Sequence, residues 1–292
     1  MDRGRLTLLG VPIDSVGQSG GTELGPRALR KLLEPAGLDD AGDTERQIRG
    51  LDRDPRNGWL AYEDNLGVTA EIRERVGELI AGGRIPVVLG GCCTLLPGAL
   101  AGARDSLGEI GLACLDGHLD LFTGETSPTG EGADMPVAAA LGMAPPELLT
   151  AIGPEPPLDP VRTALIGARD REEFELIAPL PAGTGIGRIE DRDALRHADL
   201  DRLGASVAGE LEAGGRYWIH LDVDILDPKA FPATDYLMDD GLSLPELKAI
   251  LRPLAESDAV AGISVTCFNP EKDRDGQSGA ALATLLDCAL IA

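Results

Sequence analysis

The amino-acid sequence predicts an α/β fold built on a mainly parallel, doubly wound sheet. Short apolar runs alternate with amphipathic segments along the chain, which is the pattern of parallel strands joined by crossover helices. The apolar runs are almost uninterrupted, as expected for strands that are buried on both faces. The chain has 292 residues with no internal repeat and no low-complexity linker, so we expect a single catalytic-size domain, 1–292.

Each expected element follows from its local pattern. The strands are expected at residues 5–11, 85–91, 110–118, 162–169, 217–227 and 260–269. The helices are expected at 25–33, 68–83, 198–215 and 242–257, several of which end in Gly, a common residue at helix C-termini. We interpret the Pro-rich segment 142–160 as a surface connection.

Composition restricts the class of partner. A net charge of -23 would repel nucleic acid and anionic membranes, and it favours a small, cationic guest. No apolar run approaches the length of a membrane span, so no membrane partner is expected. The five cysteines lack the spacing of a disulfide framework, which indicates reduced thiols and a cytoplasmic protein.

Acidic side chains follow two of the apolar runs. Asp116, His118 and Asp120 occupy every second position after the third run, and Asp222 and Asp224 do so in the fifth. On a strand, such side chains point to the same face. Buried carboxylates that meet there need a compensating positive charge, and an oxygen-rich set with one imidazole suits a pair of manganese ions. A lone D-x-D is also common as a solvated or turn-capping pair, so the two motifs carry the prediction together.

Five blocks of the sequence then resemble the ureohydrolase (arginase and agmatinase) superfamily. They are "GVPIDSVGQSGGTELGPRALRKL", "LGGCCT", "LDGHLDLFTGETSPTGEGADMP", "LDVDILDPKAFPATDYLMDDGLSLPEL" and "FNPEKD". They occur in the family's order and span nearly the whole chain, and the D-x-H-x-D and D-x-D-x-x-D-P blocks are the specific ones.

The resemblance implies a three-layer α/β/α fold and two Mn(II) ions that share a bridging hydroxide. It assigns Asp116 and Asp222 as bridging ligands, with Cys93 and Asp120 on the first ion. It assigns His118 and Asp224 to the second ion. The catalytic residues implied are Asp116, Asp120 and Asp222, with Asp120 steadying the hydroxide by a hydrogen bond.

Three positions depart from the family pattern. Cys93 stands where relatives have a histidine ligand, and it either binds the metal or only packs at the strand end. Ala133 stands where arginases place a histidine that shuttles protons, and Cys267 where the family usually has a guanidinium-binding Glu. Loss of the first and second histidines resembles the branch that hydrolyses N-omega-hydroxyarginine.

The same resemblance suggests where substrate binds. The positions that hold the amino-acid end in arginases correspond to Phe122, Thr129, Glu131, Asp170 and Glu172, of which Phe122 and Glu131 do not match the family residues. Asp235 and Tyr236 replace small residues beside the metals, either to receive a cationic group or merely as a capping Asp and a packed Tyr. Glu131 and Glu172 suit an amine better than a carboxylate.

We therefore expect a binuclear-manganese hydrolase of a C–N bond in a guanidino or N-hydroxyguanidino compound. Two alternatives stay open: hydrolysis of another amidine or amide at the same centre, and a metal-binding relative that has lost turnover. The sequence leaves the oligomeric state open between a monomer and a homo-oligomer.

Overall fold

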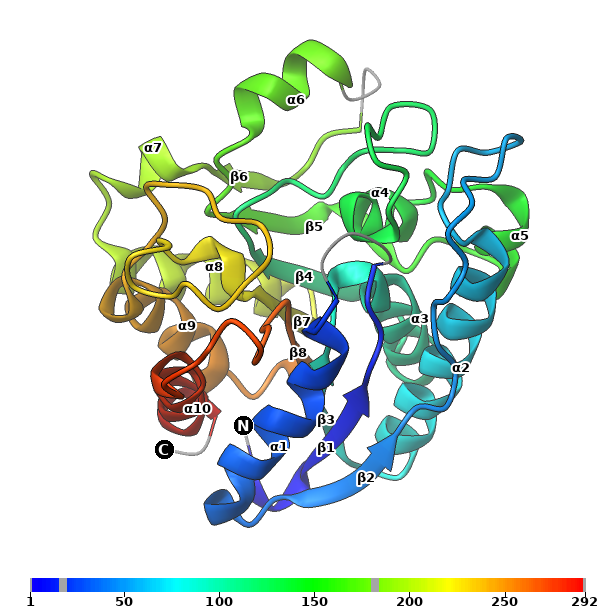
Figure 1. The fold of residues 1–292 in the computed structure, drawn as a ribbon. Helices are drawn as coiled ribbons and strands as arrows, with labels where there is room; N and C mark the ends of the chain where they lie inside the picture. Colours follow the sequence, from blue (N-terminus) through cyan, green and yellow to red (C-terminus); the bar gives the residue numbers. More distant parts are fainter. Residues whose placement is uncertain (1, 16–19, 180–183, 291–292) are drawn as a thin grey trace.

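In the residues that the computed structural model describes (2–15, 20–179 and 184–290), eight parallel strands form one sheet at the centre of the molecule (Figure 1). Their order across the sheet is β2-β1-β3-β8-β7-β4-β5-β6. The strands are β1 Leu6–Val11, β2 Asp39–Asp43, β3 Ile85–Gly90, β4 Ile110–Leu115, β5 Leu158–Ile166, β6 Arg188–Glu190, β7 Tyr217–Asp222 and β8 Val260–Thr266. All six predicted strands are present. Residues 16–19 of the N-terminal family block lie outside the described residues.

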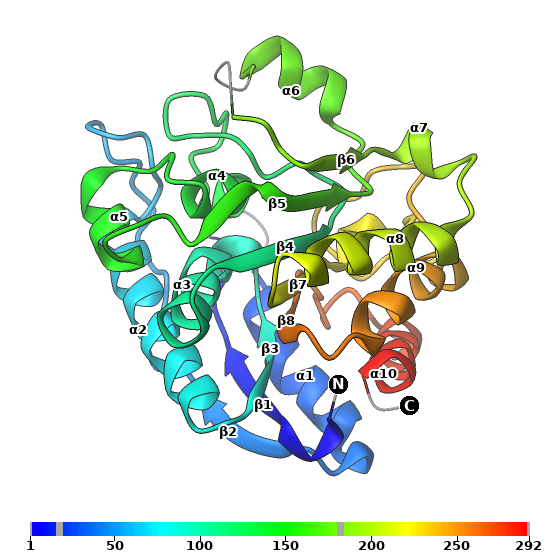
Figure 2. The same cartoon turned by 180° about the vertical axis from the view of Figure 1, so that it is seen from behind.

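Helices cover both faces of this sheet, so the expected three-layer α/β/α arrangement is confirmed. Helices α1, α10, α9 and α8 pack in sequence on one face, and α2, α3 and α5 pack together on the other (Figures 1 and 2). The bounds are α1 Gly25–Leu33, α2 Tyr62–Ala81, α3 Leu96–Leu107, α4 Pro136–Ala140, α5 Pro146–Ile152, α6 Arg171–Ile177, α7 Arg192–Leu195, α8 Leu200–Ala213, α9 Leu244–Glu256 and α10 Gln277–Leu290. None of these helices combines the length and apolar character needed to cross a membrane.

Helix α9 shows how the local sequence sets an element's limits. The Ser243 hydroxyl accepts a hydrogen bond from the Glu246 backbone N–H, and the Glu246 carboxylate accepts one from the Ser243 N–H. This reciprocal pair satisfies two N–H groups that the first turn of a helix leaves without partners. Leu247, Ile250 and Leu254 then recur at helical spacing and are fully buried. The predicted helix at 242–257 is therefore confirmed, with α9 occupying Leu244–Glu256.

The interpretation of residues 142–160 as a surface connection was wrong. Helix α5 lies within this segment and buries Leu148 and Ile152 against α2 and α3. Strand β5 also begins there, at Leu158. Pro145 and Pro146 stand at the start of the helix, where a missing N–H costs no hydrogen bond, and the other prolines of the segment follow its end at Ile152, so they do not exclude a helix.

The chain order places one end of the sheet in position to bind a ligand. The chain runs from β1 outward to β2, returns to β3 beside β1, and then crosses to β4 in the other half of the sheet. Loops at the carboxyl ends of the strands separate at such a reversal and leave a crevice. Strands β8 and β7 lie between β3 and β4, so the loops of these four strands surround the same place.

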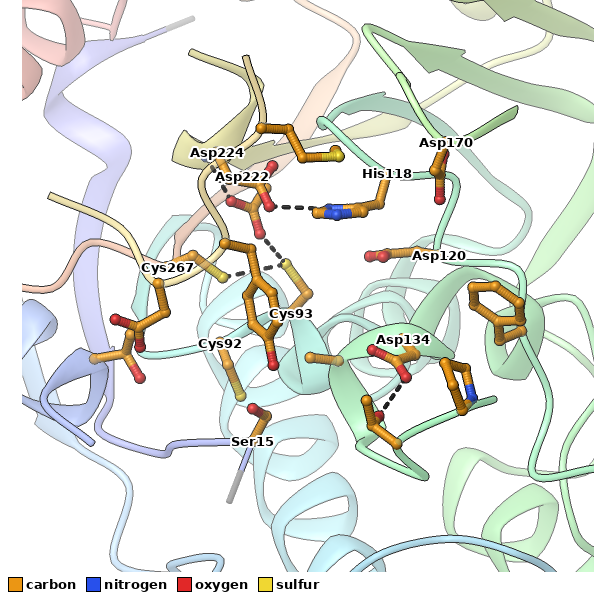
Figure 3. A pocket seen from close by; sticks show the side chains of 18 of the residues that line it. Ser15, Cys92, Cys93, His118, Asp120, Asp134, Asp170, Asp222, Asp224 and Cys267 are labelled. Carbon is orange, nitrogen blue, oxygen red and sulfur yellow. Dashed lines mark hydrogen bonds and ion pairs between the residues drawn. The ribbon is translucent and has the colours of Figure 1, made fainter. Parts of the chain in front are cut away.

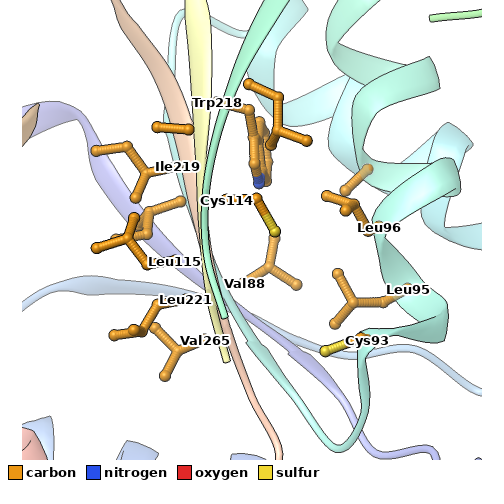
Figure 4. Packing of buried hydrophobic residues seen from close by; sticks show 14 of the residues in the cluster. Val88, Cys93, Leu95, Leu96, Cys114, Leu115, Trp218, Ile219, Leu221 and Val265 are labelled. Atoms are coloured by element: carbon orange, nitrogen blue, oxygen red, sulfur yellow. The ribbon is translucent and has the colours of Figure 1, made fainter. Parts of the chain in front are cut away.

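The central strands bury large side chains against small ones. Trp218 of β7 is fully buried, and its direct partner on β8 is Gly262. Figure 4 shows Trp218 and Cys114 on the face of the sheet toward Leu95 and Leu96. A methyl group at Gly262 would meet the six-membered ring of Trp218, so glycine at this position is a packing requirement.

We expect Gly262→Ala to lower the free energy of unfolding by about 1–3 kcal/mol, because the added methyl overpacks a core that cannot yield. Chemical denaturation followed by circular dichroism measures the change. Gly209→Ala on the exposed face of α8 is the matched control, since its methyl would meet nothing within 4 Å. That variant should gain up to about 1 kcal/mol from helix propensity. Equal stabilities of the two variants would contradict the packing account.

Candidate metal centre

A pocket opens at the carboxyl ends of the central strands. Its described lining comes from the segments that follow β1, β3, β4, β5, β7 and β8, with the loop at 128–134 and the loop at 235–238 closing its sides (Figure 3). The lining residues that matter below are Ser15, Cys92, Cys93, His118, Asp120, Thr129, Ala133, Asp134, Asp170, Glu173, Asp222, Asp224, Asp235, Tyr236 and Cys267. The crevice predicted from the strand order is therefore the place where the acidic motifs meet.

The D-x-H-x-D residues reach this pocket from a loop, and the prediction that they alternate along a strand was wrong. Strand β4 ends at Leu115, so Asp116, His118 and Asp120 all follow it. Asp120 has a φ of 56°, in the left-handed region, which strand residues do not adopt. The loop turns because the Asp116 carboxylate accepts a hydrogen bond from the His118 N–H at 2.7 Å.

The second acidic motif turns in the same way. Strand β7 ends at Asp222, whose carboxylate accepts a hydrogen bond from the Asp224 N–H at 2.8 Å. Asp224 in turn accepts one from the Gly117 N–H at 3.0 Å. A side chain at position 117 would lie 2.8 Å from the Asp224 carboxylate, so glycine lets the two loops touch.

Within the part of the chain that the structure describes, three groups of side chains could each hold a metal ion, since the candidate ligand atoms of each group lie within 4.8 Å of one another. The groups are Asp116 with His118 and Asp224, Cys93 with Asp222 and Cys267, and Cys93 with Asp116 and His220. Asp116 belongs to two of them and so links the two sides of the site. Asp120 belongs to none, although its side chain points into the same pocket in Figure 3.

His118 is held between two acids. Its Nδ1 lies 3.0 Å from Asp224 Oδ2 and 3.7 Å from Asp116 Oδ1. Burial alone would lower the pKa of His118, but the carboxylates of Asp224 and Asp116 raise it well above its usual value. The imidazole thus supplies a positive charge beside these acids when no cation is bound.

One imidazolium does not balance the remaining carboxylates. Asp116, Asp120, Asp222 and Asp224 are each at most 6% exposed. Burial raises the pKa of Asp116 to about 6 and, helped by neighbouring acids, raises the pKa values of Asp120 and Asp222 well above their usual range. The Oδ2 atoms of Asp116 and Asp120 are buried without a hydrogen-bond partner. Unpartnered buried carboxylate oxygens with raised pKa values fit divalent cations, which favour the ionised form.

The predicted substrate residues are placed differently from one another. Thr129, Asp170, Asp235, Tyr236 and Cys267 line the pocket. Asp235 is already paired, because Lys272 Nζ lies 2.7 Å from its carboxylate and Asn269 donates to it at 2.8 Å. Asp170 accepts a hydrogen bond from the Leu119 N–H at 3.1 Å and so holds the D-x-H-x-D loop.

Glu131 and Glu172 have opposite surroundings. Glu131 is buried behind the pocket wall, where its carboxylate accepts hydrogen bonds from Ser15 and Tyr236, each at 2.8 Å. Glu172 is exposed on α6 and does not line the pocket, whereas its neighbour Glu173 does. Glu172 therefore lies outside the pocket lining and Glu173 reaches it, because adjacent residues on a helix point about 100° apart.

Sequence reasoning missed several residues of this site. Ser15 joins the predicted Tyr236 in donating hydrogen bonds to Glu131, and Asp134 accepts hydrogen bonds from Ser127 at 2.6 Å and from Thr129. Ser15 and Asp134 lie within the family blocks, but no spacing pattern singles them out, so only the fold reveals their contacts. His220 of β7 is buried, with Nε2 at 3.2 Å from Cys93 Sγ. Burial lowers the pKa of His220 to about 3, so the ring is neutral.

Comparison with known proteins gives the family. A sequence model of the arginase family matches residues 5–292. The chain belongs to the arginase family. An arginase from Brevibacillus brevis is 29% identical over 289 residues, which cover 96% of each chain. As an arginase-family member, the protein is an amidinohydrolase, an enzyme that hydrolyses linear amidines.

Solved structures of the arginase family share its fold. An arginase from Bacillus caldovelox superposes with a TM-score of 0.87 at 26% identity and covers 98% of both chains. An agmatine ureohydrolase from Thermoplasma volcanium superposes with a TM-score of 0.72 at 21% identity, covering 99% of this chain and 89% of its own. The second match supports the fold alone.

We expect divalent cations to raise the thermal midpoint of this arginase-family protein, because a ligand that binds only the folded state stabilises it by about 2.7 kcal/mol at 100 times its dissociation constant. Asp222→Asn should lose most of this increment. The metal-free variant should be no less stable than the metal-free parent, since the amide removes a buried negative charge. Differential scanning calorimetry with and without MnCl₂ measures both effects.

Asp134→Asn is the matched control, because Asp134 lines the same pocket but belongs to none of the metal-capable groups. It should keep the full cation-dependent increment. An equal loss in both variants would contradict the ligand assignment and indicate a general response to pocket charge.

Proposed function

We propose that this chain hydrolyses the C–N bond of a guanidino compound at a centre of two divalent cations, with an N-hydroxyguanidine as its preferred substrate. The observation that carries the proposal is the buried convergence of Asp116, His118, Asp120, Asp222 and Asp224 in a chain of the arginase family. The curated relatives named above are arginases, and that name describes those proteins.

The donors fit the cations that the resemblance implies. Asp116, His118 and Asp224 would hold one ion, and Asp222, Cys93 and Asp120 would contribute to the other. The family resemblance implies that the two ions would share Asp116 and Asp222. Oxygen and imidazole donors favour Mn(II) at the first position, and the resemblance extends this to two Mn(II) ions. When bound, the ions would lower the pKa of a water molecule enough to provide hydroxide near neutral pH.

The chain's own residues would position the reactants. The Asp120 side chain points into the pocket between the two acidic loops, where it can accept a hydrogen bond from the attacking water. Asp170 keeps that loop in place through the Leu119 N–H. Tyr236 lies edge-on to His118, with ring centroids 6.2 Å apart and an interplanar angle of 86°, and flanks the pocket on that side.

Charge and shape indicate the substrate class. Among the described residues that line the pocket, many are acidic and none is Lys or Arg. Such a lining favours a substrate that carries an amino group at the end remote from the reacting carbon. Glu173 and Asp170 on one side and Thr129 on another are the polar groups available to that end.

The reacting end differs from that of an arginine. A departing alkylamine must be protonated. The family resemblance implies that arginases supply this proton from a histidine at the position that corresponds to Ala133. Here Ala133 lines the pocket, and a thiol at Cys267 cannot pair with a guanidinium as a carboxylate does. An N-hydroxyguanidine is less basic than a guanidine and more easily bound uncharged, so it depends less on a carboxylate at the position of Cys267.

Two further features belong to the same proposal. One sheet collects strands from both halves of the described sequence, which supports a single catalytic domain over residues 1–292. All five cysteines are free thiols, which supports a reducing compartment such as the cytoplasm. Both statements bear on how the enzyme should be prepared, namely as the full chain with reductant.

The test is a substrate panel on full-length, reduced protein loaded with Mn(II). Arginine, agmatine and their N-hydroxy derivatives are assayed for release of urea or hydroxyurea. We expect kcat/KM for an N-hydroxyguanidine to exceed that for its guanidine counterpart by about tenfold or more. Faster hydrolysis of arginine would overturn the N-hydroxy preference, and binding of two ions without any turnover would favour a metal-binding relative.

We expect Ala133→His to raise kcat for a plain guanidine by about 10²-fold, because a positioned general acid contributes 10²–10⁴-fold to such reactions. The gain should be smaller for the N-hydroxyguanidine. Ala133→Asn fills similar space without an ionisable group and serves as control. Equal gains in the two variants would show that filling the pocket, not proton transfer, is responsible.

A further inference from the structure

Two buried thiols meet on one side of the centre. Cys93 follows β3 and Cys267 follows β8, and these strands are paired neighbours in the sheet. The two sulfur atoms lie 3.8 Å apart, and Cys93 Sγ lies 2.7 Å from Asp222 Oδ2 (Figure 3). The three candidate ligand atoms lie within 4.8 Å of one another.

We propose that Cys93, Cys267 and Asp222 form a binding position for a thiophilic divalent cation, so that the two halves of the centre select different metals. This inference rests on the proposed two-cation centre and replaces Mn(II) by a zinc-like ion at one of its positions. It also gives Cys267 a role that its place in the family pattern does not have.

The backbone presents Cys267 to the other sulfur. Its φ of 67° lies in the left-handed region, which a residue with a side chain seldom adopts. The Cys267 N–H donates to the carbonyl of Gly91 at 2.9 Å, so it is tied to the segment just before Cys93. Backbone conformations of this kind persist where the surrounding structure imposes them, and they concentrate at functional sites.

A chain of hydrogen bonds ends on the sulfur of Cys93. Trp218 Nε1 donates to Ser264 Oγ at 2.9 Å, and Ser264 Oγ lies 2.6 Å from His220 Nδ1. Because Ser264 Oγ accepts the hydrogen bond from Trp218, its own O–H can donate a hydrogen bond to His220 Nδ1. The neutral ring then carries its proton on Nε2, which donates to Cys93 Sγ at 3.2 Å. Such outer hydrogen bonds orient metal ligands and stabilise their charged form.

The contact between Cys93 and Asp222 marks the place for the cation. In the absence of an ion, the Cys93 thiol donates a hydrogen bond to the Asp222 carboxylate. A cation bound by thiolates displaces such protons and occupies the space between the donors. The adjacent carboxylate then completes a set of two sulfurs and one oxygen.

The two halves differ in donor chemistry. Soft thiolate donors select ions such as Zn(II) and Co(II), whereas carboxylates and imidazole accept Mn(II). The group of Asp116, His118 and Asp224 has no sulfur, and the group of Cys93, Asp222 and Cys267 has two. Asp116 lies near Cys93 as well as His118, so it can connect the two ions.

The experiment uses Co(II) as a spectroscopic probe on reduced, metal-free, full-length protein. Thiolate bound to Co(II) absorbs strongly in the near ultraviolet by charge transfer, and oxygen or imidazole donors do not. We expect such a band, with Cys93→Ser and Cys267→Ser each removing about half of its intensity. Zn(II) should abolish the band in competition, and a roughly 100-fold excess of Mn(II) should not.

Cys92→Ser is the matched control, because Cys92 is buried beside Cys93 and lines the same pocket but is absent from the metal-capable groups. It should keep the full band. A parent protein without the band, a Cys267→Ser variant with the full band, or a Cys92→Ser variant without it would each overturn the assignment.

The spectrum separates this inference from the proposed function. Binding of Co(II) without a sulfur band, together with hydrolysis of a guanidino compound, would overturn the thiol site and leave the function intact. A sulfur band that depends on Cys93 and Cys267, together with failure on every compound of the panel, would support the site and overturn the function.

Discussion

The structure is organised around the need to neutralise carboxylates that the sheet brings together. Parallel strands end at the same edge, and the loops after β4 and β7 deliver four aspartates to one buried place. His118 offsets part of this negative charge through Asp224 and Asp116. The remaining negative charge is not offset: the pKa values of Asp116 and Asp120 are raised, and their Oδ2 atoms are buried without a hydrogen-bond partner. Burying these carboxylates without cations costs free energy, so the folded site is adapted to bind cations.

Around this acidic centre, the neighbouring residues serve mainly to hold loops. Gly117 lets the Asp224 loop approach, Asp170 fixes the Leu119 N–H, and Ser15 and Tyr236 hold Glu131. Most polar groups near the centre are therefore already hydrogen-bonded, and few remain to recognise the substrate. Helix geometry likewise separates residues that look interchangeable in sequence, since Glu173 reaches the pocket and its neighbour Glu172 does not.

The centre has two chemically distinct sides. Carboxylates and an imidazole from the loops after β4 and β7 form one, and thiols from the loops after β3 and β8 lie beside Asp222 on the other. Cys93 and Cys267 are 174 residues apart in sequence but adjacent in space, with their sulfur atoms 3.8 Å apart. Two thiols from distant segments thus face the same position of the pocket, where we propose a thiophilic cation.

Local sequence determined the buried strands, the long capped helices and the residue types of the site, because burial on both faces and helix capping are recorded in short patterns. It did not determine the edge strands β2, which is mostly exposed, and β6, which is half-buried, because neither carries an apolar run. It also missed α3. Gly98 and Gly102 are residues typical of loops, but in this helix they let α2 approach closely. Only the tertiary structure decided how the site residues meet, because loops, not strand alternation, carry Asp116, His118 and Asp120, and strand order alone brings Cys267 to Cys93.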